Sequence, residues 1–223
     1  MVRAQFSNLL GMFIFISWTI SYLLFMTAPM AMASAFFNEI HYDNSGSDIG
    51  EAFEIAGTAG TTLENWSLAL YNGDGGTVYG TKSLSGTIPD QQNGFGVQLF
   101  SCPGLQNGPD GVALIDDNGL VIQFLSYEGS FSAVEGPAAG MTSINIGVFE
   151  DGSTPAGYSL QLTGTGTIYS DFSWIGPVQA SFGTINTSQN FGSDAVPLPP
   201  SVILLSSGLL GLIQLRRRER ETP

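Results

Sequence analysis

Residues 111–127, GVALIDDNGLVIQFLSY, place two apolar runs on either side of Asp116-Asp117-Asn118-Gly119. An Asn-Gly pair accepts the positive φ angles that a tight hairpin turn requires, and each apolar run is long enough to form one strand. The stretch therefore predicts an antiparallel β-hairpin.

The same pattern of short apolar runs and turn residues recurs between residues 36 and 195. Helix signals are almost absent there, because Gly or Asn interrupts the chain every few residues and no 3.6-residue period is sustained. Turn sequences also occur at 72–76 and 164–166. We predict nine strands, at 36–42, 52–56, 66–71, 78–84, 94–100, 111–115, 120–127, 159–162 and 172–175. Short strands joined by such turns are typical of an antiparallel β-sandwich or barrel.

The N-terminal segment has the layout of a signal peptide. Arg3 precedes an apolar run over residues 9–26, and Ala33-Ser34-Ala35 supplies an Ala-x-Ala cleavage site. We therefore expect a signal helix within residues 1–35, removed after Ala35. The alternative is an uncleaved membrane anchor, because the apolar run approaches the length of a membrane span. In both cases we expect the rest of the chain to be exported.

The C-terminal segment, residues 196–223, combines three features in a fixed order. A proline motif comes first, then an apolar run over 201–215 expected to be helical, then a cluster of arginines. The motif is Val196, Pro197, Leu198, Pro199 and Pro200, and the arginines are Arg216, Arg217, Arg218 and Arg220. About 15 apolar residues are few for a stable span, but flanking arginines stop translocation. We expect transient or permanent membrane anchorage by this segment.

This order of proline motif, Gly/Leu-rich apolar stretch and arginine cluster resembles the PEP-CTERM group of bacterial sorting signals, in its VPLPA-type variant. Pro200 stands where that variant usually has Ala. The resemblance implies an exosortase-type processing enzyme as a partner. It also implies a secreted protein of the Gram-negative cell envelope, cell surface or extracellular matrix, such as a biofilm matrix.

Charge is unevenly distributed along the chain. The predicted domain at 36–195 contains Lys82 as its only Lys or Arg, against 17 of the 19 acidic residues. Binding to phosphate backbones needs Lys and Arg to displace counterions, and anionic lipid headgroups attract basic segments. We therefore expect no direct binding of nucleic acid and no docking of this domain on anionic lipid headgroups.

Three stretches of the predicted domain resemble the lamin-tail family. They are Asn38-Glu39-Ile40-His41-Tyr42, the acidic strand Gly50-Glu51-Ala52-Phe53-Glu54-Ile55, and Leu63-Glu64-Asn65-Trp66-Ser67-Leu68. Ala52 and Asn65 depart from the usual pattern, while residues 110–116 with Val121-Ile122 resemble a later hairpin of the family. The resemblance implies an immunoglobulin-like β-sandwich that acts as a binding or tethering module. It carries over no catalytic residue.

Residues suited to catalysis or to transition-metal binding are few. His41 is the only histidine, and its place in the opening strand predicts a structural role at a solvent-facing or edge position. One His and one Cys cannot supply the three or four ligands of a zinc site. Cys102 cannot form an internal disulfide, and we expect it to be a small buried apolar side chain, with a reactive thiol as the alternative.

Carboxylates leave two further hypotheses open. Glycoside hydrolysis needs two of them held several ångströms apart, and Glu39, Glu51 and Glu54 are the candidates. A calcium ion prefers carboxylate, amide and carbonyl oxygens, which turns of this chain supply. The candidate calcium ligands are Asp43, Asp48, Asp74, Asp116 and Asp117. Asp also favours turns by bonding to its own backbone, so these residues fit a plain turn role as well.

Aromatic residues divide into two groups. Phe53, Trp66 and Phe124 fall in strands and are expected in the core. Another four aromatics could form a face that stacks on carbohydrate, or could pack in the core and at its rim: Tyr79, Tyr158, Tyr169 and Trp174.

Together these patterns predict a non-enzymatic exported surface or matrix protein, without an obligatory cofactor, whose sandwich binds extracellular polysaccharide or surface proteins. The alternatives are a secreted carboxylate-dependent hydrolase acting on glycans and a structural protein stabilised by Ca²⁺.

Overall fold

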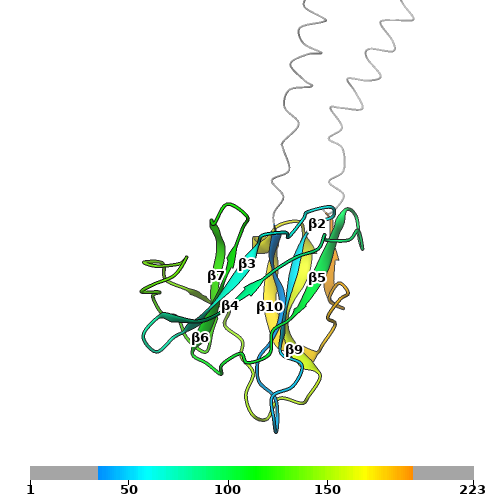
Figure 1. Ribbon diagram of the computed structural model, residues 1–223. Coiled ribbons are helices and arrows are strands. Elements are labelled where there is room, and N and C mark those ends of the chain that lie inside the picture. The colour runs from blue at the N-terminus through cyan, green and yellow to red at the C-terminus, as the bar shows by residue number, and fades with distance from the viewer. Residues whose placement is uncertain (1–34, 193–223) are drawn as a thin grey trace, which may run out of the picture. The chain divides into compact units, whose positions relative to one another are not determined.

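The computed structural model describes residues 35–192, which form two β-sheets that face each other (Figure 1). The first sheet has the strand order β10-β9-β1-β2-β5, and β11 also pairs with β9. Its strands are β1 (Ala35–His41), β2 (Ala52–Thr58), β5 (Phe95–Ser101), β9 (Tyr158–Gly166), β10 (Phe172–Gln179) and β11 (Gln189–Phe191).

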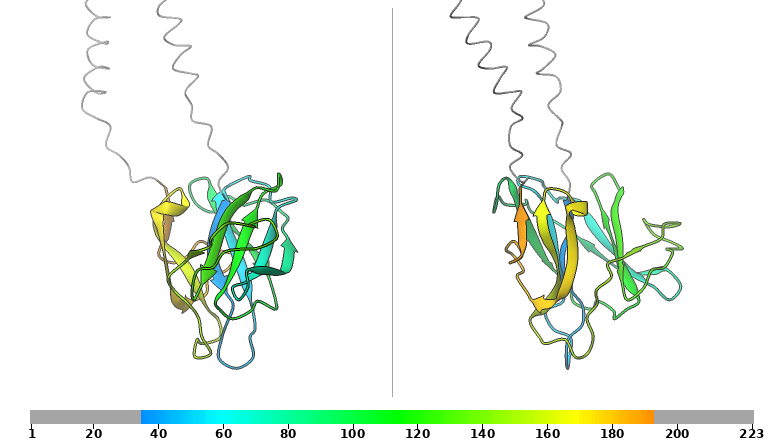
Figure 2. Two further views of the ribbon diagram at one scale, coloured as in Figure 1. Left: turned by 90° about the vertical axis from the view of Figure 1, so that its left-hand side faces the viewer. Right: turned by 180° about the vertical axis from the view of Figure 1, so that it is seen from behind.

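The second sheet has the strand order β4-β3-β6-β7-β8. Its strands are β3 (Ser67–Asn72), β4 (Thr77–Ser83), β6 (Asp110–Ile115), β7 (Val121–Tyr127) and β8 (Ile144–Asn145). Pairing is antiparallel except between β9 and β11 and between β7 and β8. Figure 2 shows the two sheets as separate layers, with β9, β10 and β11 in yellow to orange and β6 and β7 in green.

All nine predicted strands are present, with ends shifted by a few residues at most positions, so the all-β sandwich-like architecture is confirmed. The 111–127 hairpin is also confirmed: Gly119 has φ of 81°, and its N–H bonds to the Asp116 carbonyl at 3.0 Å. Residues 35–192 contain no α-helix, and a single 3-10 turn spans Tyr169–Asp171.

One predicted turn is wrong. Residues 164–166 are the end of β9 and pair with β11, and Gly164 also pairs with Phe172 of β10. The glycines there serve close packing: a Cβ on Gly166 would lie 2.1 Å from the Cβ of Asp171. The chain instead turns at 167–171, where the Asp171 carboxylate accepts hydrogen bonds from the N–H groups of Thr167 and Ile168.

A hydrophobic core fills the space between the sheets. Ile40 of β1 and Phe53 of β2 are register partners in it, and Leu68 and Leu114 oppose them from β3 and β6. The alternation of strand side chains puts every second residue on this inner face. A register shift between Phe37 and Glu39 keeps Phe37 and Ile40 both in the core.

The outer faces of both sheets are covered too. Residues 129–143 fold over the outer face of the second sheet, where Ala133 and Ala138 pack with Tyr71 and Phe124. The chain after β10 folds over the outer face of the first sheet and ends with Phe191 in a third apolar cluster, beside Phe36. Strands β1 and β2 are therefore buried on both faces, and their outward side chains are shielded from water.

No helix among residues 35–192 is long and apolar enough to cross a membrane. The predicted signal helix and the apolar C-terminal run both lie outside the described residues.

Candidate functional site

The chemistry-bearing side chains of β1 lie on its outer face. Glu39 pairs with Glu54 of β2, and His41 pairs with Ala52, whereas the intervening Ile40 points into the core. Glu39 and Glu54 are 0% exposed and His41 is 2% exposed. Two carboxylates and the only imidazole of the chain thus share one buried surface of the first sheet.

Glu39 is surrounded by hydrogen-bond donors. Its Oε1 accepts from the Ser159 hydroxyl at 2.5 Å, the Gln161 amide at 3.1 Å and the Ser181 N–H at 2.9 Å, while Oε2 accepts from the Ser181 hydroxyl at 3.0 Å. Burial raises the pKa of Glu39, and these hydrogen bonds oppose that rise only in part.

Glu54 accepts fewer hydrogen bonds than Glu39, and its pKa is raised further. Its Oε1 accepts from the Asn38 amide at 2.9 Å, and its Oε2 accepts from the Gly183 N–H at 2.6 Å. Burial, with a smaller contribution from the neighbouring Glu39 charge, raises the pKa of Glu54 to about 8. A carboxylate in this environment tends to hold a proton at neutral pH.

The structure brings together two of the three candidate hydrolase residues and separates the third. Glu39 and Glu54 are direct neighbours across β1 and β2, but residues 180–189 cover them and bond to both. Glu51 lies just before β2, where its carboxylate accepts the Gly104 N–H at 2.6 Å. The adjacent pair therefore acts as a buried anchor for the covering segment.

The prediction that His41 is solvent-facing or at an edge is wrong. Its strand is internal to the sheet, and its ring is bonded on both sides: Nδ1 lies 2.9 Å from Glu150 Oε1, and Nε2 lies 3.0 Å from the Ile49 carbonyl oxygen. Burial lowers the pKa of His41, but the hydrogen bond and charge of Glu150 outweigh it, so the net direction is upward. Both bonds agree with the structural role predicted for His41.

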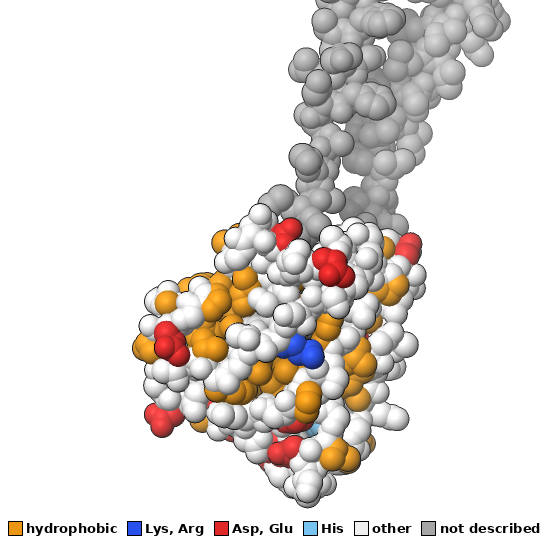
Figure 3. Space-filling model, in the orientation of Figure 1, with side chains coloured by type: hydrophobic (Ala, Val, Ile, Leu, Met, Phe, Trp, Pro, Cys, Tyr) orange, Lys and Arg blue, Asp and Glu red, His pale blue; other side chains and the backbone are white. Residues whose placement is uncertain are grey.

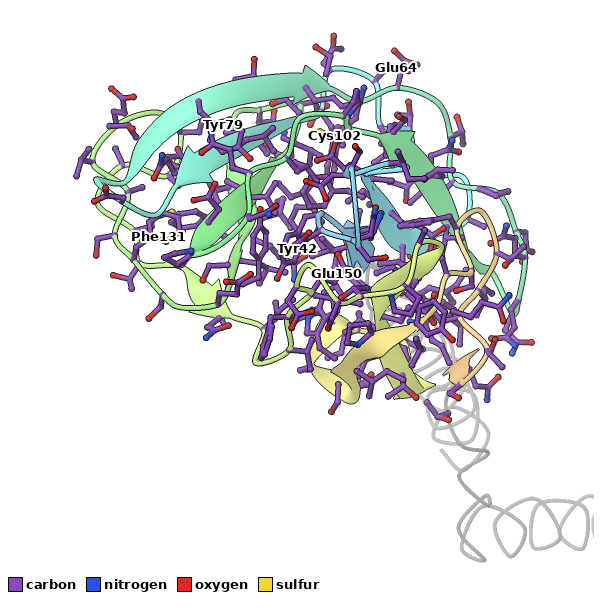
Figure 4. The ribbon with its side chains drawn as sticks, turned by 90° about the horizontal axis from the view of Figure 1, so that it is seen from below. Tyr42, Glu64, Tyr79, Cys102, Phe131 and Glu150 are labelled. Carbon is purple, nitrogen blue, oxygen red and sulfur yellow. The ribbon has the colours of Figure 1, made fainter. Side chains whose placement is uncertain are left out.

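Glu150 organises the end of β1 nearest to this histidine. Its Oε2 accepts the N–H groups of Tyr42 at 2.7 Å and Asp43 at 3.1 Å, and its own N–H donates to the Tyr42 hydroxyl oxygen at 2.8 Å. Figure 4 shows Tyr42 beside Glu150 in the view from below. Sequence reasoning missed Glu150 because it lies 109 residues from His41, and nothing local marks it as the histidine's partner.

Tyr42 connects this cluster to the second sheet. Its ring stacks on Tyr127 with a centroid distance of 3.8 Å, and its hydroxyl donates to Glu128 at 2.8 Å. Burial is the main cause of a strongly raised pKa for both tyrosines. These contacts join the two layers at the end of the sandwich that the 43–51 loop borders.

Open hollows lie around this cluster. One of about 330 Å³ is lined by His41, Ile49, Tyr158 and Phe182, and a neighbouring one of about 540 Å³ by Phe149, Tyr158 and Pro177 among others. Tyr158 borders both. The other three aromatics considered for carbohydrate stacking pack against the core: Trp174, which donates to the Tyr169 hydroxyl at 2.9 Å, together with Tyr169 itself and Tyr79.

Cys102 is buried as predicted and forms no disulfide. Burial raises the pKa of its thiol, and the nearby Lys82 charge only partly opposes this rise. Both residues line a third hollow of about 320 Å³ with Leu70 and Tyr79. Figure 3 shows that the basic (blue) surface on this face of the molecule is bordered by hydrophobic surface.

The candidate calcium ligands lie in three different turns. Asp43 and Asp48 belong to the 43–51 loop, where burial and the adjacent Asp48 raise the pKa of Asp43. Asp74 lies in the β3–β4 turn, and Asp116 and Asp117 lie in the β6–β7 hairpin. No group of three or more His, Cys, Asp or Glu side chains in the 35–192 region is arranged to hold a metal ion.

Their hydrogen bonds agree with a turn role. Asp116 Oδ1 accepts the N–H groups of Asn118 at 2.9 Å and Leu120 at 2.7 Å, which stabilises the hairpin turn. In the 43–51 loop, Asp48 Oδ1 accepts the Asn44 N–H at 3.3 Å.

No protein-family model, curated protein or solved structure matches this chain. Functional assignment therefore depends on the residues and their geometry.

The sorting motif at 196–200, the arginine cluster at 216–220 and Ala33 lie outside the described residues. Ala35 is the first residue of β1, pairs with Gly57 and is 1% exposed. The residue that the predicted cleavage site places last in the signal peptide is thus part of the folded sheet.

Proposed function

We propose that this chain is a non-enzymatic, exported surface or matrix protein whose β-sandwich has a binding or structural role. The observation that carries the proposal is that its potentially reactive side chains are buried and hydrogen-bonded within the fold. Glu39 and Glu54 are buried and hydrogen-bonded to residues 180–189, which cover the first sheet, and both ring nitrogens of the buried His41 bond to protein acceptors. A general acid or base has to reach the substrate proton directly or through one water, which such coverage opposes.

The two ends of the sequence support the export of the protein and its delivery to the surface. The N-terminal apolar run with its Ala-x-Ala site directs export, and the C-terminal segment is the signal for an exosortase-type enzyme. The arginine cluster retains the apolar run in the inner membrane until that enzyme acts.

The domain itself we assign to an immunoglobulin-like, lamin-tail-like sandwich. Support comes from the motif-bearing stretches, which coincide with β1, β2 and the β6–β7 hairpin. Its partners are extracellular polysaccharide or other surface proteins. The hollows that share Tyr158 are the place to look for them, because an aromatic ring beside polar loop atoms suits a sugar face.

The sorting proposal is tested with the full-length chain in a Gram-negative host that carries an exosortase. We expect protease-accessible protein at the cell surface or in the matrix, and accumulation in the inner membrane when Pro197 and Pro199 are both changed to Ala. The matched control is Pro103→Ala, because Pro103 is an exposed proline in the loop between β5 and β6, away from the motif. Cytosolic, unprocessed protein in the parent strain would refute the proposal.

The competing hydrolase is tested by activity screening on a panel of glycans with the wild-type protein and a Glu39→Gln variant. We expect no turnover by either protein. Turnover by wild type that is lost in Glu39→Gln, with Glu64→Gln as an exposed-carboxylate control that retains it, would establish the hydrolase instead.

A further inference from the structure

The covering segment of the first sheet, residues 180–189, donates three hydrogen bonds to the two buried carboxylates, beside others that it makes with groups that do not titrate. Ser181 donates both its N–H and its hydroxyl to Glu39, and Gly183 donates its N–H to Glu54. The segment joins β10 to β11 and contributes no charged side chain of its own. Its closure over the sheet therefore depends on how Glu39 and Glu54 are charged.

Polar side chains complete the attachment on either side. Asn186 Nδ2 donates to the Leu162 carbonyl at 2.9 Å, and Gln189 Nε2 donates to Asn38 Oδ1 at 2.7 Å. Asn38 in turn donates to Glu54, so a continuous hydrogen-bonded chain connects Gln189 to the carboxylate pair. These groups do not titrate, which leaves the carboxylates as the variable part of the network.

No basic group in the described part of the chain lies against this pair to neutralise it. Lys82 is the only Lys or Arg in residues 35–192, and it belongs to the other sheet. His41 lies further along the outer face of β1 and is bonded to Glu150. The nearest titratable group on β9 is Tyr158, and β5, β10 and the covering segment present none to the pair.

We propose that Glu39 and Glu54 form a proton-dependent clasp for residues 180–189: the segment is closed while the pair holds one proton and opens when both carboxylates are ionised. This conformational device goes beyond the proposed surface function and does not depend on it. The proton is released to solvent, and the two like charges, directly opposite in neighbouring strands, then draw water under the segment.

The direction of the pH dependence follows from the pH at which the second carboxylate ionises. Burial and the Glu39 charge raise the pKa of Glu54 to about 8 in the closed form, whereas an opened, hydrated carboxyl returns toward the ordinary value of 4.5. Between these two values each pH unit favours the open, doubly ionised form about tenfold, and above about pH 8 the ratio levels off because the closed form has lost its proton too. Phe191 stays packed in its apolar cluster, so opening is confined to the residues before β11.

Hydrogen exchange measured by NMR on the full-length chain in detergent micelles tests this directly. The reporters are the Ser181 and Gly183 amides, whose protection factors we expect to fall about tenfold between about pH 6 and pH 7 after correction for intrinsic exchange, and to level off above about pH 8. The Leu114 amide of β6, in the core of the other sheet, should stay more strongly protected than both reporters at every pH, because it exchanges only when the whole sandwich unfolds. Equal protection of all three amides would show that no local clasp exists.

Variants distinguish local opening of the clasp from a general loss of structure at alkaline pH. Glu54→Gln cannot ionise, and we expect Ser181 protection in it to be independent of pH between about 6 and 9. Glu64→Gln is the matched control, because exposed Glu64 also accepts a backbone N–H, from Gly86 at 3.0 Å. Retention of the wild-type fall at Ser181 in Glu54→Gln would overturn the proposal.

A second measurement uses the wild-type chain alone, in case Glu54→Gln does not fold. Carbon-13 NMR of the Glu54 side-chain carboxyl should show a titration midpoint about 8, shifted to lower pH in Glu39→Gln because the neighbouring charge is removed. A Glu54 midpoint close to the ordinary value of 4.5 would rule out the clasp even if the segment were mobile.

Discussion

His41 shows how a single side chain can be given its role by residues far along the chain. Its Nε2 has to donate to the Ile49 carbonyl, and its Nδ1 faces the Glu150 carboxylate, so both ring nitrogens have acceptors. Such an arrangement favours the doubly protonated ring and explains the upward shift of its pKa. Glu150 also accepts two backbone N–H groups, so of the two partners of His41 it contributes more to stability than the Ile49 carbonyl does.

Glu150→Gln should destabilise the protein strongly. It removes the counter-charge of the buried His41 and weakens the acceptor of the Tyr42 and Asp43 N–H groups. Breaking a buried ion pair costs about 3–5 kcal/mol, and we expect a loss of that order in the free energy of unfolding. Urea denaturation measures it, with Asp74→Asn in the exposed β3–β4 turn as the control. A loss below about 1 kcal/mol would show that the pair contributes little.

At the level of elements, the strands were predictable and the segments that cover them were not. The nine strands carry local apolar patterns, whereas β8 and β11 have two and three residues and exist only through long-range pairing with β7 and β9. The covering segments at 129–143 and 180–189 contain many small residues such as Gly, Ser and Ala, and Gly and Ser are also typical of exposed loops. Their packing on the sheets depends on partners that no local pattern reveals.

Tyr71→Phe tests the cover of the second sheet. The Tyr71 hydroxyl accepts the Ala138 N–H at 2.9 Å and donates to the Glu135 carbonyl at 3.1 Å, so its removal leaves a buried N–H without a partner. We expect a loss of about 1–3 kcal/mol in the free energy of unfolding and faster exchange of the Ala138 amide. Tyr158→Phe, at the border of the open hollows, is the control and should change stability by less than about 0.5 kcal/mol. Equal losses in the two variants would contradict this role.

For the molecule as a whole, the buried acids determine how stability depends on pH. Burial raises the pKa of Glu54 to about 8 and that of Asp110 to about 6, and it also raises the pKa of Glu39. An acid whose pKa is higher in the folded state binds more protons there than in the unfolded chain. Its contribution therefore decreases as pH rises from the unfolded to the folded pKa.

We accordingly expect the free energy of unfolding to fall as pH rises from about 5 to 9. Glu54 alone contributes a slope of about 1.4 kcal/mol per pH unit across the range between its unfolded and folded pKa values. His41 acts in the same direction, because its stabilising charge is lost as pH rises through its raised pKa. Denaturant titrations at about pH 5, 7 and 9 measure the trend, and Glu54→Gln should flatten it. Stability that increases toward the alkaline end of this range would contradict these assignments.

The order of apolar runs and turn residues was sufficient to establish the all-β class, the nine main strands and the 111–127 hairpin, because each depends on neighbours close along the chain. It was also sufficient to predict a buried Cys102 and a core position for Phe53. The pairing of Glu39 with Glu54, the contact of His41 with Glu150 and the closure of residues 180–189 arise only in the folded chain. They join groups up to 151 residues apart, and burial changes the acidity of the carboxylates once those contacts form.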